Sequence, residues 1–162
     1  MDDPADQQGQ AARARFQKVL LATDLTAASE RAAAQALELA VGLDATLLIV
    51  SVIDHGQQRR TGTDAQRIDQ VRSEREVAAR ALVEEGRRHG IPVHFLIWEG
   101  DPGEAIVEAA AAEDADIIVV GSRGRTGVGR MILGSVSDHV VRHATVPVVV
   151  VRQREDGIEP AG

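Results

Sequence analysis

Residues 117–135 have the sequence IIVVGSRGRTGVGRMILGS, in which four apolar residues lead directly into a glycine-rich segment. An uninterrupted Val/Ile run is typical of a parallel strand that is covered on both faces. A helix is predicted over 135–143, immediately after the glycine-rich segment. A strand, a glycine-rich loop and a helix in this order predict an α/β protein with an anion-binding turn.

The same alternation extends along the rest of the chain. Short apolar runs predict further strands at 18–22, 45–53, 91–98 and 146–151. Ala and Leu recur at helical spacing between the first two strands, and the sequence Asp-Pro-Gly-Glu at 101–104 predicts a helix start with the aspartate as N-cap. Strands that alternate with helices require crossover connections, which place the strands in a parallel sheet.

A long amphipathic helix is predicted over 64–89. Its residues expected to face the core are Ile68, Val71, Ala78 and Leu82. Opposite charges four residues apart, Glu76 with Arg80 and Glu84 with Arg88, are expected to pair on the other face. We interpret that charged face as solvent-exposed.

The bulk composition fits one domain. The chain has 162 residues, of which 44% are hydrophobic and only 2% aromatic, so the core is expected to consist of Val, Ile, Leu and Ala. We expect the domain over 16–154, after a flexible N-terminal arm at 1–15 and before a C-terminal tail at 155–162. The absence of cysteine excludes disulfides and thiolate zinc sites.

Charge and hydropathy narrow the class of partner. The 18 basic and 25 acidic residues give a formal net charge of −7. A nucleic-acid-binding surface usually shows a basic excess, so no nucleic-acid partner is expected. Residues 1–15 contain no apolar run of the kind found in signal peptides, and no segment approaches 18 uninterrupted apolar residues. We expect a cytoplasmic protein that does not enter the membrane.

The glycine-rich segment over 121–135 is the strongest candidate for a binding site. Glycines let main-chain N–H groups converge on an anion, and the following helix adds the positive end of its dipole. The segment contains Arg123, Arg125 and Arg130 but no acidic residue, a local excess of positive charge that suits a polyphosphate. We expect valine at Gly124 or Gly134 to abolish binding, because its branched side chain would block the approach of a phosphate and would forbid the positive φ angle that we expect at these glycines. The alternative is a long turn whose arginines point into water.

Two familiar phosphate motifs do not fit the chain. A P-loop has Lys followed by Ser or Thr after its second glycine, but Gly129 is followed by Arg130 and Met131. The dinucleotide fingerprint would follow the first strand, where residues 22–26 are Ala-Thr-Asp-Leu-Thr. The glycine-rich segment is therefore neither a P-loop nor a dinucleotide fingerprint.

A different nucleotide motif is present. The spacing Gly-x2-Gly-x9-Gly-Ser resembles that of ATP-binding members of the universal stress protein family, and it is met here by Gly121, Gly124, Gly134 and Ser135. The resemblance continues through 140–151 and also covers Asp24 and the turn at 99–102. It spans about 16–152 with the elements in the same order.

The resemblance implies a Rossmann-like fold with a single doubly wound, five-stranded parallel sheet in the order 3-2-1-4-5 and helices on both faces. In that order the chain winds one way from the first strand and the other way from the fourth. Ligands of open α/β sheets lie beyond the carboxyl ends of the strands at such a switch point. Asp24 follows the first strand and Gly121 follows the fourth. The glycine–serine motif and the strand order therefore indicate the same location for the binding site.

Individual roles are also implied by the resemblance. Main-chain N–H groups and the Ser135 hydroxyl would hold ribose and phosphates, and the Val52 backbone would bind the adenine edge. Asp24 would face the ribose hydroxyls or a Mg²⁺ ion bound to the phosphates. The residues expected to form the ATP site are Ala22, Asp24, Val52, Gly121, Arg123, Gly124, Gly134, Ser135, Val136 and Ser137. Asp24 is followed by Leu25 and Thr26, where many relatives have Gly-Ser, and its alternative role is that of a turn residue.

These expectations describe an ATP-binding stress-response sensor or regulator. Phosphoryl transfer needs a cationic group and a base at the γ-phosphate, and Asp24 is the one acid that the sequence places near the site. We therefore expect slow or absent hydrolysis and no catalytic residue. The alternative is a weak ATPase or phosphotransfer enzyme that uses the same site. A phosphoacceptor receiver is not expected, because it would need neighbouring acids after the first strand and a lysine after the fifth.

The strand at 146–151 bears on assembly, and two other features have simple interpretations. An apolar strand at the edge of a sheet tends to be paired or covered, and the resemblance implies a homodimer through this one. His139 and His143 are four residues apart on one helix, but no third ligand is evident, so no metal site is expected there. Trp98 is expected to pack against the sheet from an edge strand.

Overall fold

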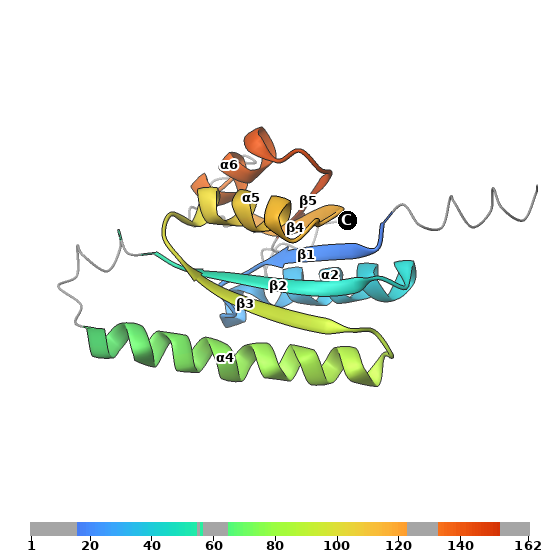
Figure 1. The fold of residues 1–162 in the computed structure, drawn as a ribbon, viewed down its shortest axis with the longest axis horizontal. Helices are drawn as coiled ribbons and strands as arrows, with labels where there is room; N and C mark the ends of the chain where they lie inside the picture. The colour runs from blue at the N-terminus through green and yellow to red at the C-terminus, as the bar shows by residue number, and fades with distance from the viewer. Residues whose placement is uncertain (1–15, 55, 57–64, 123–132, 153–162) are drawn as a thin grey trace, which may run out of the picture.

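The computed structural model describes residues 16–54, 56, 65–122 and 133–152. Its centre is a five-stranded sheet in the order β3-β2-β1-β4-β5, and all four neighbouring pairs run parallel (Figure 1). The predicted strand order is confirmed. The strands are β1 (Lys18–Ala22), β2 (Thr46–Ile53), β3 (Val93–Glu99), β4 (Ile117–Ser122) and β5 (Val148–Arg152).

Helices cover both faces of the sheet. Figure 1 shows α2 (Glu30–Leu43) and α4 (Ala65–Arg88) on one face, with α5 (Pro102–Ala112) and α6 (Ser135–His143) on the other. A short 3-10 helix, η1 (Ala27–Ser29), precedes α2. The helix predicted over 135–143 is confirmed with the same bounds.

Alternation along the strands divides the core into two apolar layers. In β1, Val19 and Leu21 pack with α2, whereas Leu20 and Ala22 pack with α5. Successive side chains of a strand point to opposite faces, so a continuous apolar run fills both layers. Trp98 on the edge strand β3 is half-buried against the α5 layer, which confirms its predicted packing role.

The start of α5 follows its sequence signal. The Asp101 side chain accepts a hydrogen bond from the Glu104 main-chain N–H at 3.0 Å, and Pro102 occupies the first turn. An N-cap of this kind contributes about 1 kcal/mol to helix stability. The predicted start of this helix is confirmed.

Strand β5 begins later than predicted. The expected strand began at Val146, but β5 begins at Val148. Pro147 lies between them and has no N–H to donate to a sheet. Its carbonyl still accepts a hydrogen bond from Ile118 at 3.0 Å, so proline marks the boundary of the strand.

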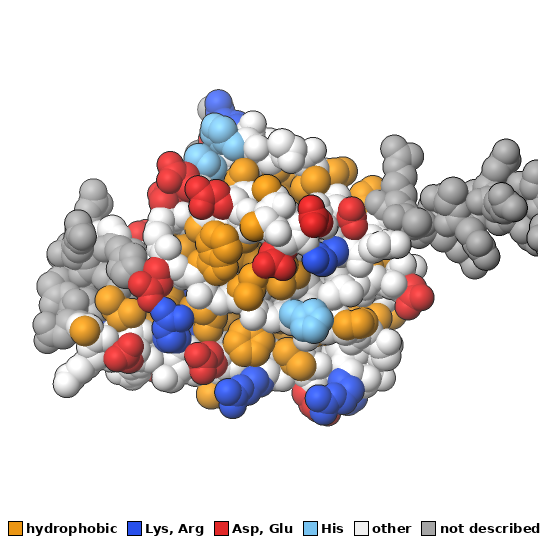
Figure 2. All heavy atoms as spheres, in the orientation of Figure 1, with side chains coloured by type: hydrophobic (Ala, Val, Ile, Leu, Met, Phe, Trp, Pro, Cys, Tyr) orange, Lys and Arg blue, Asp and Glu red, His pale blue; other side chains and the backbone are white. Residues whose placement is uncertain are grey.

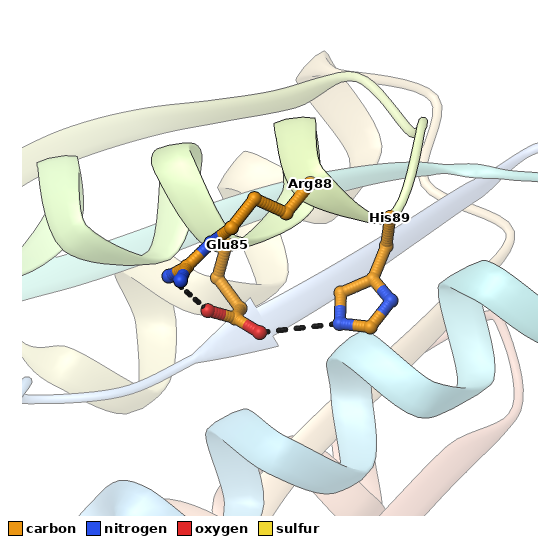
Figure 3. Close-up of polar contacts among 3 residues, drawn as sticks. All are labelled: Glu85, Arg88 and His89. Atoms are coloured by element: carbon orange, nitrogen blue, oxygen red, sulfur yellow. Dashed lines mark hydrogen bonds and ion pairs between the residues drawn. The ribbon is translucent and has the colours of Figure 1, made fainter.

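The ion pairs predicted on α4 are wrong in register. Glu84 pairs with Arg87 at 3.1 Å, while Glu85 pairs with both Arg88 and His89 (Figure 3). Glu76 and Arg80 form no ion pair in the described part of the chain. Exposed side chains three and four residues apart are alternative partners of similar small energy, a few tenths of a kcal/mol. Spacing alone therefore does not choose between them.

The surface carries both signs of charge. Figure 2 shows acidic and basic side chains interspersed around hydrophobic ones over β3 and α5. The middle of β3, residues 95–98, is half-buried, as suits a strand at a sheet edge. Within the described residues, no helix is both long enough and apolar enough to cross a membrane.

Candidate functional site

A cavity of about 780 Å³ opens at the carboxyl edge of the sheet. It lies where β1 and β4 end, and the connections after these two neighbouring strands lead to opposite faces of the sheet. The beginnings of α2, α5 and α6 complete its wall. The topology therefore places the cavity at the predicted switch point.

Eight of the ten residues predicted for the site line this cavity. They are Ala22, Asp24, Val52, Gly121, Gly134, Ser135, Val136 and Ser137. Arg123 and Gly124 lie outside the described residues, as do Arg125 and Arg130. Segments more than 110 residues apart in the sequence, from Ala22 to Ser137, are thus brought together at one opening.

The start of α6 is the part of the cavity best suited to an anion. Gly134 is its N-cap and provides no side chain, and the first intrahelical hydrogen bond runs from Asp138 N–H to the Gly134 carbonyl at 2.9 Å. The N–H groups of the first turn therefore have no acceptor within the helix. The Ser137 hydroxyl, which is buried, donates to the Gly134 carbonyl at 3.0 Å. The hydrogen bonds from Asp138 and Ser137 to the Gly134 carbonyl therefore hold the N–H groups of the first turn of α6 at the cavity wall.

The expected positive φ at Gly134 is wrong. Gly134 has φ −61° and ψ 160°, an extended conformation that any residue adopts. A glycine here is not demanded by the backbone angle. The remaining advantage of glycine is that it places no side chain beside the N–H groups in the first turn of α6. Gly124 lies outside the described residues.

Asp24 both lines the cavity and forms a turn. Its Oδ1 accepts hydrogen bonds from the Thr26 N–H at 3.1 Å and the Thr26 hydroxyl at 2.8 Å. Leu25, between Asp24 and Thr26, has a φ of 59°, in the left-handed region that favours glycine. The turn role that was the alternative for Asp24 is confirmed, and the carboxylate remains at the mouth of the site.

Arg75 reaches the cavity from α4 and was missed by the sequence interpretation. Its Nη1 donates to the Ser51 hydroxyl at 3.0 Å and to the Val52 carbonyl at 2.6 Å. Burial lowers the pKa of the guanidinium. A signal was available, because position 75 falls between 71 and 78 on the stripe that was expected to face the core. A charged residue on an apolar stripe is a candidate for a functional role.

The helices α5 and α6 meet at another part of the wall. A Cβ added to Gly103 would lie 2.8–2.9 Å from Cβ, Cγ and Cδ2 of His139, so these helices approach closely at a residue without a side chain. The His139 ring stacks on that of His143 with centroids 4.1 Å apart. Within the described residues, no group of three or more His, Cys, Asp or Glu side chains could hold a metal ion.

Charges of both signs line the cavity. Among the described residues, three are basic and three are acidic: Arg31, Arg75, Arg152, Asp24, Asp54 and Asp101. The described wall is therefore balanced in formal charge. The three arginines of the glycine-rich segment add a positive excess to the sequence between Gly121 and Gly134.

Comparison with known proteins gives one consistent result. Residues 15–152 match the model of the Universal stress protein family. A universal stress protein of Thermus aquaticus is 38% identical over 150 residues, which cover 85% of this chain and 99% of that protein.

Solved structures give the same result for the fold. A Methanocaldococcus jannaschii protein, solved for structure-based assignment of its biochemical function, has a TM-score of 0.75 and 26% identity, covering 88% of this chain and 99% of its own. A universal stress protein in complex with cAMP has a TM-score of 0.66 and 25% identity, covering 85% and 98%.

Proposed function

Since the chain belongs to the universal stress protein family, we propose that it binds ATP in the cavity at the carboxyl ends of β1 and β4 and acts as a cytoplasmic, nucleotide-responsive regulator of a stress response. One observation carries the proposal. The first turn of α6 presents N–H groups without helical acceptors or a side-chain cap to this cavity. By contrast, the start of α5 is capped by Asp101. An uncapped helix start at a switch point is suited to a phosphate group.

The described residues fit an adenine nucleotide. The cavity volume lies within the range of about 300–1000 Å³ that is usual for small-molecule sites. Ala22, Val52 and Ile106 supply an apolar part for the base, and Ser135 and Ser137 lie at the phosphate end. Gly121, Gly134 and Val136 would leave room or donate from the main chain. Arg123 and Gly124 complete the proposed set from outside the described residues.

Magnesium would accompany the phosphates rather than occupy a site of its own. Mg²⁺ usually keeps several waters and binds one or two carboxylates together with phosphate oxygens. Asp24 supplies a carboxylate at the cavity, while no cluster of three candidate ligands exists in the described residues. Asp24 is therefore proposed to contact a phosphate-bound Mg²⁺ ion or the ribose hydroxyls.

A known complex supports a nucleotide as the ligand. The similar universal stress protein that was solved with cAMP shares the sheet and helix arrangement over 85% of this chain. That protein holds an adenine nucleotide. We extend this to ATP because the spacing of Gly121, Gly124, Gly134 and Ser135 in the sequence resembles that of ATP-binding members of the family.

A weak ATPase is the second candidate function. The observation in its favour is the Asp24 carboxylate at the wall of the proposed phosphate site. Against efficient catalysis, Asp24 is held in a turn by Thr26. We propose regulation by binding as the main function, with hydrolysis slow or absent.

We also propose that the protein is a homodimer through β5. Among the described strands, β5 forms one edge of the sheet, and its outer main-chain groups have no neighbouring strand there. The Val149 side chain is 38% exposed, whereas Val148 and Val150 pack against the α5 layer. An apolar edge strand of this kind is normally covered.

The site proposal is tested by calorimetric titration of ATP into Gly134→Val. The extended backbone at Gly134 accepts valine, so the variant is expected to fold, but its branched side chain would stand at the N-cap of α6. We expect at least a tenfold loss of affinity, about 1.4 kcal/mol. Gly42→Ala is the matched control, because a Cβ there meets nothing within 4 Å. A folded Gly134→Val protein with unchanged ATP affinity would contradict the site.

A further inference from the structure

We infer that Arg75 is a specificity-determining residue that weakens the preference of the site for 6-amino over 6-keto purine nucleotides. The inference rests on the proposed nucleotide function. It concerns the Val52 carbonyl, the main-chain acceptor that would bind the amino group of adenine. Arg75 already donates to that carbonyl at 2.6 Å.

The sheet explains why the Val52 carbonyl faces the cavity. The Val50 carbonyl, two residues earlier on β2, accepts from Thr23 N–H on the β1 side at 3.1 Å. The Ile53 carbonyl accepts from Gly100 on the opposite side. Carbonyls two residues apart on a strand point the same way, so the Val52 carbonyl points past the end of β1 at Ala22. Among the described residues, no strand residue donates to this carbonyl, and Arg75 donates to it instead.

Neighbouring polar groups hold the Arg75 guanidinium at the Val52 carbonyl. Its second Nη1 hydrogen bond goes to the hydroxyl of Ser51, a residue that is fully buried. Within the described residues, no carboxylate forms an ion pair with Arg75. The charge is therefore held among neutral acceptors, and burial lowers its pKa. In the part of the chain that the structure describes, no acidic side chain competes with these acceptors for the guanidinium.

Hydrogen-bond chemistry then sets the consequence for the ligand. A guanidinium has five N–H donors and no acceptor. The Val52 carbonyl has two lone pairs, and Arg75 takes one of them, so a 6-amino group that approaches this carbonyl must share it with a guanidinium whose N–H groups cannot bond to another donor. A 6-keto oxygen at the same place accepts from Arg75. Hypoxanthine and guanine nucleotides thereby become candidate ligands alongside ATP, whereas a free carbonyl would favour adenine.

The experiment compares ATP with ITP, which differ at position 6 and its neighbouring ring nitrogen, in wild type and Arg75→Met. Methionine keeps an apolar stem and removes every donor. We expect the ratio of the ITP dissociation constant to the ATP dissociation constant to rise about tenfold in Arg75→Met, since loss of one charged hydrogen bond and release of one carbonyl act in the same direction. Taking the ratio cancels contacts that both nucleotides share.

Arg72→Met is the matched control. Arg72 lies on the same helix but pairs with Glu99, and it is not among the residues that line the cavity. The ratio of the ITP dissociation constant to the ATP dissociation constant in Arg72→Met should equal that of the wild type. If Arg75→Met does not fold, Arg75→Gln carries the same expectation, because its shorter neutral side chain withdraws from the carbonyl.

The outcomes separate the inference from the function on which it rests. An unchanged or lower ratio in a folded Arg75 variant, with ATP still bound by wild type, overturns the role of Arg75 alone. A rise of equal size in Arg72→Met also overturns it. If the wild type binds neither ATP nor ITP, the proposed function is wrong, and the inference falls with it.

Discussion

The Lys18 ammonium group donates a hydrogen bond to the main-chain carbonyl of Glu113, which ties the start of β1 to the end of α5. Lys18 is the chain's single lysine. It begins β1, whereas the candidate site lies where β1 ends at Ala22. The structure thus assigns this cation to the amino edge of the sheet, away from the cavity.

We predict that Lys18→Met lowers the free energy of unfolding without changing ligand affinity. The substitution leaves the Glu113 carbonyl at a helix end without its charged donor, a loss of about 1–2 kcal/mol. Urea denaturation followed by circular dichroism measures the change. ATP affinity should stay at the wild-type value, and a large loss of affinity would contradict the placement of Lys18 away from the site.

Gly103→Ala is predicted to destabilise the protein by about 1–3 kcal/mol, the usual cost of overpacking. The new methyl group would lie 2.8 Å from the His139 ring and 2.9 Å from its Cβ, so rotation of the imidazole alone cannot relieve the contact. Thermal unfolding of Gly103→Ala and Gly42→Ala should shift in opposite directions, because alanine is favoured over glycine at an open helical position. Equal stability of Gly103→Ala and wild type would show that α5 and α6 adjust freely.

Much of the fold could be predicted because its signals are local. Short apolar runs located all five strands, and the Asp-Pro-Gly-Glu sequence located the start of α5. The order of the strands came from a family resemblance, since no local signal specifies which parallel strands are neighbours. The errors lie where several solutions have similar energy, as with the partners of Glu84 and Glu85 on α4.

The site was predicted less completely than the fold. Residues next to strand ends, such as Asp24 and Gly121, follow from topology. Arg75 lies in the middle of a helix, and its role depends on a side chain that reaches the end of another element. The φ of Gly134 was wrong because glycine permits a positive angle without requiring one. Side-chain reach and main-chain angle are set by tertiary packing, which spacing does not record.

Val149→Lys is predicted to give a folded monomer. Val149 is partly exposed on the edge strand β5, so lysine there costs the protomer little, but it would place charge in a paired edge. Light scattering should show a dimer for wild type at micromolar concentration and a monomer for the variant. Val148→Lys is expected to unfold or aggregate, because Val148 packs against the α5 layer. A monomeric wild type would contradict the proposed dimer.

We predict that the protein hydrolyses ATP slowly or not at all. Rate acceleration requires contacts that are stronger in the transition state than in the ground state. The α6 N–H groups and the helix dipole stabilise bound phosphate in both states. Lys18 is engaged at the opposite edge, and Asp24 Oδ1 accepts two hydrogen bonds from Thr26. We therefore expect a rate constant below about 0.01 per second, far under the 1–1000 per second of ordinary enzymes.

A phosphate-release assay with Asp24→Asn as the comparison tests this rate. The asparagine oxygen retains the acceptor for both Thr26 hydrogen bonds, so the turn is preserved while the carboxylate is removed. If the residual rate is contamination or water attack without a base, wild type and Asp24→Asn will release phosphate equally slowly. Turnover near one per second that is lost in Asp24→Asn would instead identify Asp24 as a catalytic base. The protein would then be an ATPase, because the matched turn leaves the carboxylate as the one difference between the two proteins.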